Sequence, residues 1–310
     1  MQQTRRDFLK DLPALALMYY FGKRGKLFDY NNHSTHDLSV AAIETNLDLL
    51  SNYTERSERT LEQLANLLKN EGSIDIVLTS EGNFSGYVDI NSNYNDRKRL
   101  VLHQVDGEYK LHPSSDGDII SKVEFVQDLA RRYGSNIFLG TFYEVSDEKT
   151  FDNTQLHIDL NCRIFARKRK REPPEKDLLI QTSSGKTYKA LSLICWEAFQ
   201  GREVRINGQT HYAPPNWAIN GAPYDIMLHP KDTPETSAAE VFSYVEKLGV
   251  PSHIEETVKD FKRYYSLYFK LLKEGAPLVI ADRSQMGIFN KDLSPFKNFH
   301  KTKEYTVVRI

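Results

Sequence analysis

The sequence contains few of the residues that cross-link a chain or give it a strong charge. Two cysteines in 310 residues allow at most one bridge, so neither a disulfide framework nor a cysteine-rich zinc site is predicted. The formal net charge of -1 offers no electrostatic argument for a nucleic-acid partner. The apolar stretch of residues 12–22 is too short to cross a bilayer, so no stable transmembrane span is expected.

The composition is otherwise that of a folded protein. Hydrophobic residues make up 40% and aromatic residues 11% of the chain, which are ordinary values for a globular protein and argue against disorder over the whole chain. A chain of 310 residues can form one large domain or two small ones with a sizeable core.

The N-terminus resembles a twin-arginine export signal. The segment T-R-R-D-F-L-K (residues 4–10) is followed by the apolar stretch 12–22, as expected of an address that a receptor reads. Asp11 and Pro13 interrupt the start of the apolar region, and no A-x-A cleavage site precedes Gly25. The alternative is a basic amphipathic N-terminal helix.

This pattern predicts three segments: a signal-like segment at residues 1–22, a polar linker at residues 23–37 and a folded domain at residues 38–310. If the signal is read, the protein is exported to the periplasm or cell envelope. If it is not read, the protein is cytoplasmic. Whether the signal is cleaved stays open.

From Leu38 onward, apolar patterns of buried strands alternate with patterns at helical spacing. Strands are predicted at residues 38–43, 74–80, 136–144, 187–194, 224–230, 276–282, 286–290 and 306–310. A strand–turn–strand hairpin is predicted at residues 156–167, and helices at residues 54–70, 121–134, 236–248 and 253–274. The alternation, with some strands joined by short turns, predicts an α/β protein with mixed sheets.

Three reactive groups follow predicted strands. Glu81 comes directly after the strand at 74–80, Cys195 follows the apolar run A-L-S-L-I, and a basic run occupies residues 167–176. Ligands bind outside the carboxyl ends of strands in open α/β sheets, so Glu81 and Cys195 are candidates for one site. Each feature has an ordinary alternative: a surface glutamate, a cysteine that packs as a small hydrophobe, and a solvated charge run.

The order Glu–Lys–Cys on these segments resembles the nitrilase superfamily of carbon–nitrogen hydrolases, over roughly residues 38–310. The family has an apolar strand, a glutamate, an aromatic residue and G-Y. The segment T-S-E-G-N-F-S-G-Y is similar, with Ser80 in place of the usual proline. The segment L-I-C-W-E resembles the family's strand, cysteine, aromatic residue and acidic residue. The matching residues are Glu81, Phe84, Gly86, Tyr87, Ile194, Cys195, Trp196 and Glu197.

The same resemblance selects a lysine. Laid on D-L-N-C-R-I-F-A-R-K-R-K, the family pattern places Asp159 at its acidic position, Cys162 at its glycine and Lys170 at its final lysine. Lys168 then stands where the family has an aromatic residue, and it is the alternative triad lysine. Both lysines share one face of an extended strand, so strand parity does not separate them.

The resemblance implies a role for each residue. Glu81 would take the proton of Cys195 as the thiol attacks an amide carbonyl or a nitrile carbon, and would later activate water against the thioester. Lys170 and the backbone N–H of Trp196 would stabilise the charge that develops on the substrate. A carboxylate beside a thiol disfavours the thiolate, and the lysine offsets this effect.

Further candidates surround the implied triad. Glu175 is the candidate for the glutamate that orients the lysine or the water in the family, with Glu172 as second choice. Tyr87 is the candidate for substrate binding. The stretch 201–221 is either a pocket wall or an ordinary surface loop; its candidate wall residues are His211, Tyr212 and Trp217.

The resemblance also implies a four-layer α-β-β-α sandwich of two mixed sheets. It implies a small-molecule amide or nitrile as substrate, with no cofactor and no metal. A homodimer or larger homo-oligomer is expected, paired through the face near the cysteine-bearing helix. Amide hydrolysis is the leading prediction for the reaction.

Three alternatives stay open. Trp196 and Glu197 resemble the true nitrilase version of the motif, which favours nitrile hydrolysis. Transfer of the acyl group from the thioester to an amine is the second alternative, although the members that do this carry transmembrane helices. A non-catalytic binding member is the third, with Ser80, Cys162 and Lys168 as its signs.

Overall fold

The computed structural model divides the chain into two compact units, Met1–Asp37 and Leu38–Ile310. Residues 1–36 lie outside the part that the structure describes, and the predicted signal and almost all of the predicted linker lie there. The described residues are 37–43, 53–82, 84, 99–105, 108–145, 151–168, 177–194, 203–206, 208–230, 265–281, 287–290, 296, 298–302 and 304–310. Within these ranges no helix is long and apolar enough to cross a membrane.

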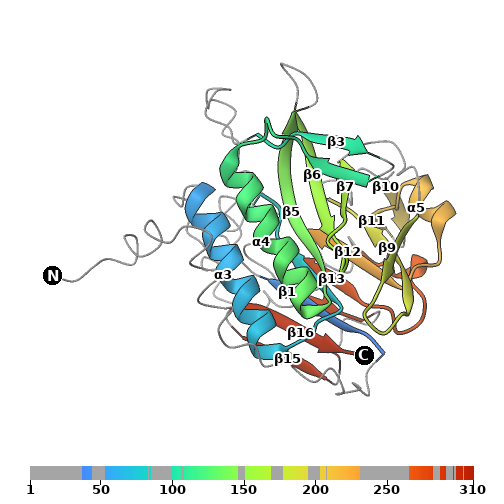
Figure 1. Ribbon diagram of the computed structural model, residues 1–310. Coiled ribbons are helices and arrows are strands. Elements are labelled where there is room, and N and C mark those ends of the chain that lie inside the picture. The colour runs from blue at the N-terminus through green and yellow to red at the C-terminus, as the bar shows by residue number, and fades with distance from the viewer. Residues whose placement is uncertain are drawn as a thin grey trace, which may run out of the picture. The chain divides into compact units, whose positions relative to one another are not determined.

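The larger sheet is mixed. Its strands are β1 (Ser39–Ile43), β2 (Ile76–Thr79), β3 (Leu102–Val105), β4 (Glu108–Leu111), β5 (Asn136–Val145), β6 (Phe151–Ile158), β7 (Ile164–Lys168), β15 (Phe299–Lys301) and β16 (Tyr305–Arg309). Their spatial order is β15-β16-β1-β2-β5-β6-β7-β4-β3 (Figure 1). β1, β2 and β5 run parallel to one another, whereas β5, β6 and β7 are antiparallel neighbours.

The second sheet is also mixed. Its strands are β8 (Leu178–Gln181), β9 (Thr187–Ser192), β12 (Ile226–Pro230), β13 (Leu278–Ala281) and β14 (Gly287–Phe289), in the order β14-β13-β12-β9-β8. The three inner strands are parallel, and the two edge strands pair antiparallel. β10 (Glu203–Ile206) and β11 (Gln209–Tyr212) form a separate hairpin.

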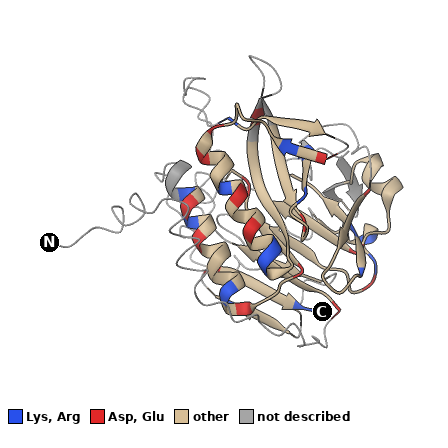
Figure 2. Ribbon diagram, viewed as in Figure 1, with Lys and Arg blue, Asp and Glu red and all other residues tan. Residues whose placement is uncertain are grey.

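Two long helices, α3 (Tyr53–Glu71) and α4 (Gly117–Tyr133), cover one face of the larger sheet (Figure 1). Each buries an apolar stripe, and Leu64 of α3 and Val126 of α4 are fully buried. Charged residues of both signs recur along both helices (Figure 2). α4 ends at Gly134, whose φ of 63° suits a glycine because it carries no Cβ.

Three apolar cores separate the layers. The first lies between the larger sheet and its helices and includes Leu64, Val126 and Leu156. The second lies between the two sheets, where Leu78 and Phe138 of one sheet pack with Leu228 of the other. The third covers the outer face of the second sheet with the short helix α5 (Asn216–Gly221) and the segment around Tyr268. These cores confirm a mixed α/β fold built from two mixed sheets.

Most predicted elements are confirmed, with corrections at their ends and in the connections. α4 begins at Gly117 and β6 at Phe151, both earlier than predicted. β3, β4, β8 and β15 were not predicted, and the stretch 201–221 forms the hairpin β10–β11 and α5 rather than a plain loop. The short or polar strands among them lack the apolar periodicity that marks a strand in a sequence.

The helix predicted at residues 253–274 ends early. Its described end, from residue 265, passes through turns into a 3₁₀ helix at Phe269–Leu271. Leu272 is extended and forms a bridge with Tyr224, so pairing beside β12 replaces the last helical turn. The predicted helix at residues 236–248 lies outside the described residues.

Candidate active site

Glu81 lies two residues beyond the end of β2, in a turn that buries it. β2 is buried throughout, and the exposed fraction is 0% for Ser80 and 7% for Glu81. Gly82 follows with a φ of 74°, a backbone conformation that most L-residues avoid. The chain therefore turns directly after the carboxylate.

Contacts with β5 hold this turn in place. The backbone N–H of Gly140 donates to Thr79 Oγ1 over 2.7 Å, and that of Gly82 donates to Thr141 Oγ1 over 3.2 Å. A Cβ atom on Gly140 would lie 1.8 Å from the carbonyl oxygen of Ser80, so only glycine allows this approach. The pairing of β5 with β6 shifts register at the same point, which is the signature of a β-bulge.

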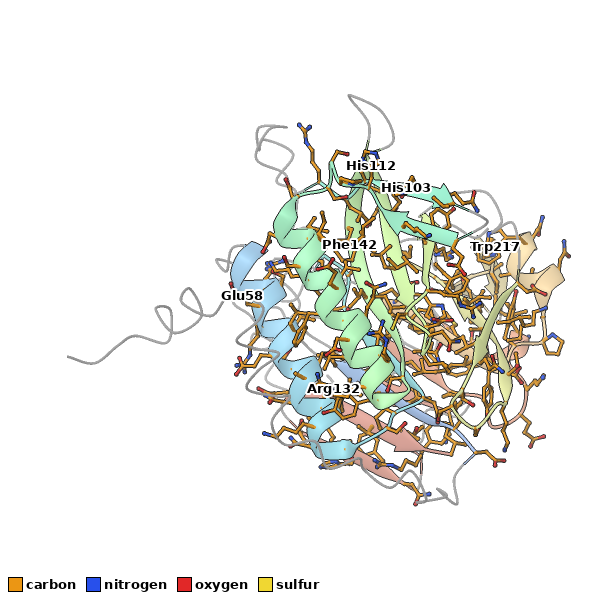
Figure 3. All side chains as sticks on the ribbon, viewed as in Figure 1. Glu58, His103, His112, Arg132, Phe142 and Trp217 are labelled. Carbon is orange, nitrogen blue, oxygen red and sulfur yellow. The ribbon has the colours of Figure 1, made fainter. Side chains whose placement is uncertain are left out.

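Phe84 anchors the chain beyond the turn. Its side chain is fully buried, and its ring stacks on that of Phe142 with a centroid separation of 5.1 Å and an interplanar angle of 19°. Phe142 is labelled in Figure 3. The aromatic residue of the glutamate motif is thus part of the helix-side core. Tyr87, predicted to bind substrate, lies outside the described residues.

The carboxylate of Glu81 accepts a hydrogen bond from β6. Asn153 Nδ2 donates to Glu81 Oε1 over 2.6 Å. Asn153 was not predicted from the sequence. One signal was available, because asparagine is depleted in strands and an asparagine inside a strand therefore indicates a specific contact.

β9 supplies the other half of the candidate site. Its last residues and the two that follow, Leu193 and Ile194, are buried. Leu193 N donates to Leu228 O over 2.9 Å, so pairing with β12 continues past the end of the strand. Cys195 directly follows Ile194 in the chain. Cys195 and Trp196 lie outside the described residues.

Contacts through β6 and β5 bring the ends of β2 and β9 to the same region. Ser192 Oγ donates to Gln155 Oε1 over 2.7 Å, across the space between the two sheets. Gln155 is paired with Thr141, whose hydroxyl accepts the hydrogen bond from Gly82. The turn that carries Glu81 and the residue three positions before Cys195 are therefore both held by the Thr141–Gln155 pair of the β5–β6 ladder.

The hairpin before the predicted lysine agrees with the register of the sequence pattern. Cys162 has a φ of 66° and is the non-glycine residue with a positive φ in the described part of the chain. Such a position normally favours glycine, and Cys162 stands where the pattern has one. Asp159 Oδ1 accepts hydrogen bonds from the backbone N–H groups of Asn161 and Arg163, at 2.9 and 2.8 Å.

The lysines themselves lie at the end of this hairpin. Lys168 is the last residue of β7, and its backbone is paired with that of Thr154, next to Asn153. Lys170 follows it by two residues and lies outside the described residues, as do Glu175 and its alternative Glu172.

The connection after the cysteine contacts the larger sheet. The guanidinium carbon of Arg167 on β7 lies 5.9 Å from the centroid of the Trp217 ring on α5, which is the range of a cation–π interaction. Trp217 is labelled in Figure 3. His211 and Tyr212 belong to β11.

A buried histidine completes the polar face of β6. His157 stacks on Phe138 with centroids 4.2 Å apart, and burial lowers the pKa of His157 to about 4. Its Nε2 lies 3.0 Å from Asn136 Oδ1. The Nδ2 of Asn136 donates to two carbonyl oxygens, those of Asp75 and Gln181. Oδ1 must therefore be the acceptor, so the neutral imidazole donates from Nε2.

No group of three or more His, Cys, Asp or Glu side chains in the described part of the chain could hold a metal ion. Cys162 is a free thiol whose Sγ donates to Gln127 O over 3.1 Å.

The fold is similar to that of known carbon–nitrogen hydrolases. No family model and no curated protein matches the sequence. Among solved structures, Saccharomyces cerevisiae Nit3, a member of branch 10 of the nitrilase superfamily, matches with a TM-score of 0.53 at 11% identity, over 87% of this chain and 89% of that one. A carbon–nitrogen hydrolase from Helicobacter pylori G27 matches with a TM-score of 0.54 at 12% identity, over 88% and 89%. An amidase from Nesterenkonia sp. matches with a TM-score of 0.50 at 11% identity, over 89% and 91%. At these identities the likeness shows the fold alone.

Proposed function

We propose that this protein, whose two-sheet fold is that of the carbon–nitrogen hydrolases, is a cysteine-dependent hydrolase of non-peptide carbon–nitrogen bonds that acts on amides. One observation carries the proposal. Glu81 is a buried carboxylate at the carboxyl end of β2, and the strand that leads to Cys195 ends in the same region. A base and a thiol at neighbouring strand ends are the parts that this reaction needs.

The first half of the reaction forms a thioester. Glu81 takes the proton of the Cys195 thiol as the sulfur bonds to the amide carbonyl carbon. It then gives the proton to the nitrogen as the carbon–nitrogen bond breaks, and ammonia or an amine leaves. In the second half Glu81 takes a proton from water as the oxygen bonds to the carbonyl carbon, and it gives that proton to the sulfur as the carbon–sulfur bond breaks. The products are a carboxylic acid and the restored thiol.

Lys170 and the backbone N–H of Trp196 stabilise the oxyanion in this proposal. The left-handed backbone at Cys162 supports the register that selects Lys170 over Lys168. Glu175 is proposed to orient the lysine or the water, and Tyr87 to contact the substrate.

The test measures ammonia release from primary amides, nitriles and N-carbamoyl compounds by the full-length protein. The Cys195→Ala and Glu81→Gln variants should each hydrolyse the substrate more slowly than the parent. For Glu81→Gln, which removes the base, we expect the rate to fall on the order of 100- to 10,000-fold. A covalent adduct on Cys195, detected by mass spectrometry, identifies the nucleophile without knowledge of the natural substrate.

Two matched controls come from the chain itself. Cys162→Gly removes the other thiol at a position whose backbone suits glycine. Glu144→Gln alters another buried glutamate, which accepts a hydrogen bond from Thr154. Neither should abolish hydrolysis. Equal ammonia release by the Cys195→Ala variant and the parent, or none by the parent on any compound, would contradict the proposal.

The same panel separates the alternative reactions. Ammonia from nitriles but not from amides would assign nitrile hydrolysis, which Trp196 and Glu197 favour in the sequence. A product in which an added amine carries the acyl group would assign acyl transfer.

Export is a separate proposal that rests on the N-terminal sequence. The protein recovered from the cell envelope should depend on the paired arginines, so Arg5→Lys combined with Arg6→Lys should retain it in the cytoplasm. Unchanged recovery from the envelope would contradict this proposal, and the N-terminal residue of the recovered protein reports cleavage.

A further inference from the structure

We propose that Asn153 is a positioning residue for the base: its side-chain amide holds the carboxylate of Glu81 in its reactive orientation and in its ionised form. This inference rests on the proposed function, because it assigns Glu81 the role of base. It adds a residue that the Glu–Lys–Cys pattern does not contain.

The contact itself defines the orientation of the amide. The separation of 2.6 Å between Asn153 Nδ2 and Glu81 Oε1 is short, as expected when the acceptor is charged. An ionised carboxylate only accepts hydrogen bonds, so the NH₂ group of Asn153 must face it. One oxygen of the base is thereby held at a known point.

This orientation of the amide is energetically unfavourable. Its own oxygen, Asn153 Oδ1, is buried and has no hydrogen-bond partner among the described residues. A buried polar atom without a partner is destabilising, and so is asparagine within a strand. The neighbouring Thr154, a residue that strands favour, has its hydroxyl bonded to Glu144 Oε2 at 2.8 Å. Stability alone therefore does not explain the amide at position 153, whereas a contact with the base does.

The strand that carries Asn153 also holds the strand that leads to the nucleophile. Gln155 lies two residues along β6, on the same face, and accepts the hydrogen bond from Ser192. β6 thus contacts both Glu81 and β9, and the spacing between their contact points is that of alternate residues in one strand. Asn153 fixes the carboxylate relative to this frame.

The donated hydrogen bond also bears on the charge of Glu81. Burial disfavours a carboxylate, and a hydrogen bond to the ionised form opposes that effect. Of the charged groups on neighbouring strands, Arg167 lies over Trp217 and Glu144 contacts Thr154 on the other face of β6. The other titratable groups assigned to the proposed site are Lys170, Cys195, Glu175 and Tyr87, which lie outside the described residues.

The test uses fluoroacetamide, which offers the thiol two carbons. Attack at the carbonyl carbon releases ammonia and needs a proton for the leaving nitrogen. Attack at the CH₂F carbon forms a carbon–sulfur bond and releases fluoride, which leaves without a proton. Ammonia release thus needs Glu81 both to take the thiol proton and to deliver a proton to the leaving nitrogen, whereas the acetamide adduct on Cys195 needs it only to take the thiol proton. Full-length parent, Asn153→Leu, Asn153→Asp and Thr154→Val are compared for both products from pH 5 to pH 9.

Asn153→Leu keeps the branching of the side chain at Cγ and removes the donor. We expect ammonia release to fall about 10- to 100-fold and the ratio of adduct to ammonia to rise, because the base is less well positioned. We also expect the acidic limb of the pH profile of ammonia release to move to higher pH, because the ionised form of the base is less well stabilised. Asn153→Asp places a second carboxylate beside Glu81 and should move the limb further. Thr154→Val removes the buried hydrogen bond to Glu144 on the opposite face of β6. It should change neither the ratio of adduct to ammonia nor the acidic limb of the pH profile.

The outcomes distinguish this inference from the proposed function. A parent that hydrolyses fluoroacetamide while a folded Asn153→Leu variant keeps the same product ratio and pH profile overturns the positioning role alone. An equal shift in Thr154→Val also overturns it, because the effect would then be one of stability. A parent that releases no ammonia from fluoroacetamide or from any compound of the earlier panel overturns both. Thermal unfolding of each variant establishes that it is folded.

Discussion

β6 has two buried faces, and they carry different kinds of side chain. The face toward α3 and α4 presents Leu156 and Ile158, which join an apolar core. The face toward the second sheet presents Asn153, Gln155 and His157, and each contacts a different segment: the turn after β2, β9 and the start of β5. Apolar packing is non-directional, whereas hydrogen bonds specify which atoms meet. The first face supplies stability, and the second sets the relative positions of the strands that carry the site.

The largest expected effect concerns the apolar face. Leu156→Ala should lower the free energy of unfolding by about 2 to 5 kcal/mol, because Leu156 is fully buried and a cavity remains. Urea unfolding measures this loss, and ammonia release per folded molecule should be retained. A stability unchanged from the parent would show that this face does not support the fold as described.

The second effect tests the polar face through pH. The imidazole of an unfolded chain binds its proton near pH 6.5, whereas the folded protein binds it at His157 only near pH 4. Between these values the unfolded state binds more protons, so the free energy of unfolding falls as pH is lowered from 6.5 towards 4, by about 3 kcal/mol in all.

The comparison for this effect is the variant His157→Gln, which cannot titrate there. Urea unfolding at several pH values should show that the variant lacks this part of the slope, although it is less stable than the parent at pH 7. If the free energy of unfolding depends on pH in the same way in the two proteins, His157 is not neutral and buried in the folded protein.

The smallest expected effect separates geometry from stability on the polar face. Ser192→Ala alone leaves the amide of Gln155 buried without its partner and should cost about 1 to 3 kcal/mol. Combining it with Gln155→Leu replaces both partners by apolar groups and should be nearly neutral. If the double variant regains stability in urea but not ammonia release, the hydrogen bond serves to align β9. Full recovery of both would show that packing alone is sufficient.

The sequence predicted most strands and both long helices of the larger core, because their apolar periodicity is local. It also predicted Glu81 at a strand end, and Cys162 at a position normally taken by glycine agrees with the observed φ of 66°. It did not predict the role of β6. In F-D-N-T-Q-L-H-I, polar residues alternate with less polar ones, a pattern that usually indicates one face in water.

The local elements and the reactive groups that follow them can be read from the amino-acid sequence, because helical and strand periodicity and the glycine requirement act over a few residues. The contacts that those groups make depend on how the two sheets pack. The second sheet packs against β6 and removes its polar face from water, and each polar group there must find a protein partner or go without one. That requirement pairs Asn153 with Glu81 and Gln155 with Ser192, residues 72 and 37 positions apart in the chain, a separation that no local pattern records.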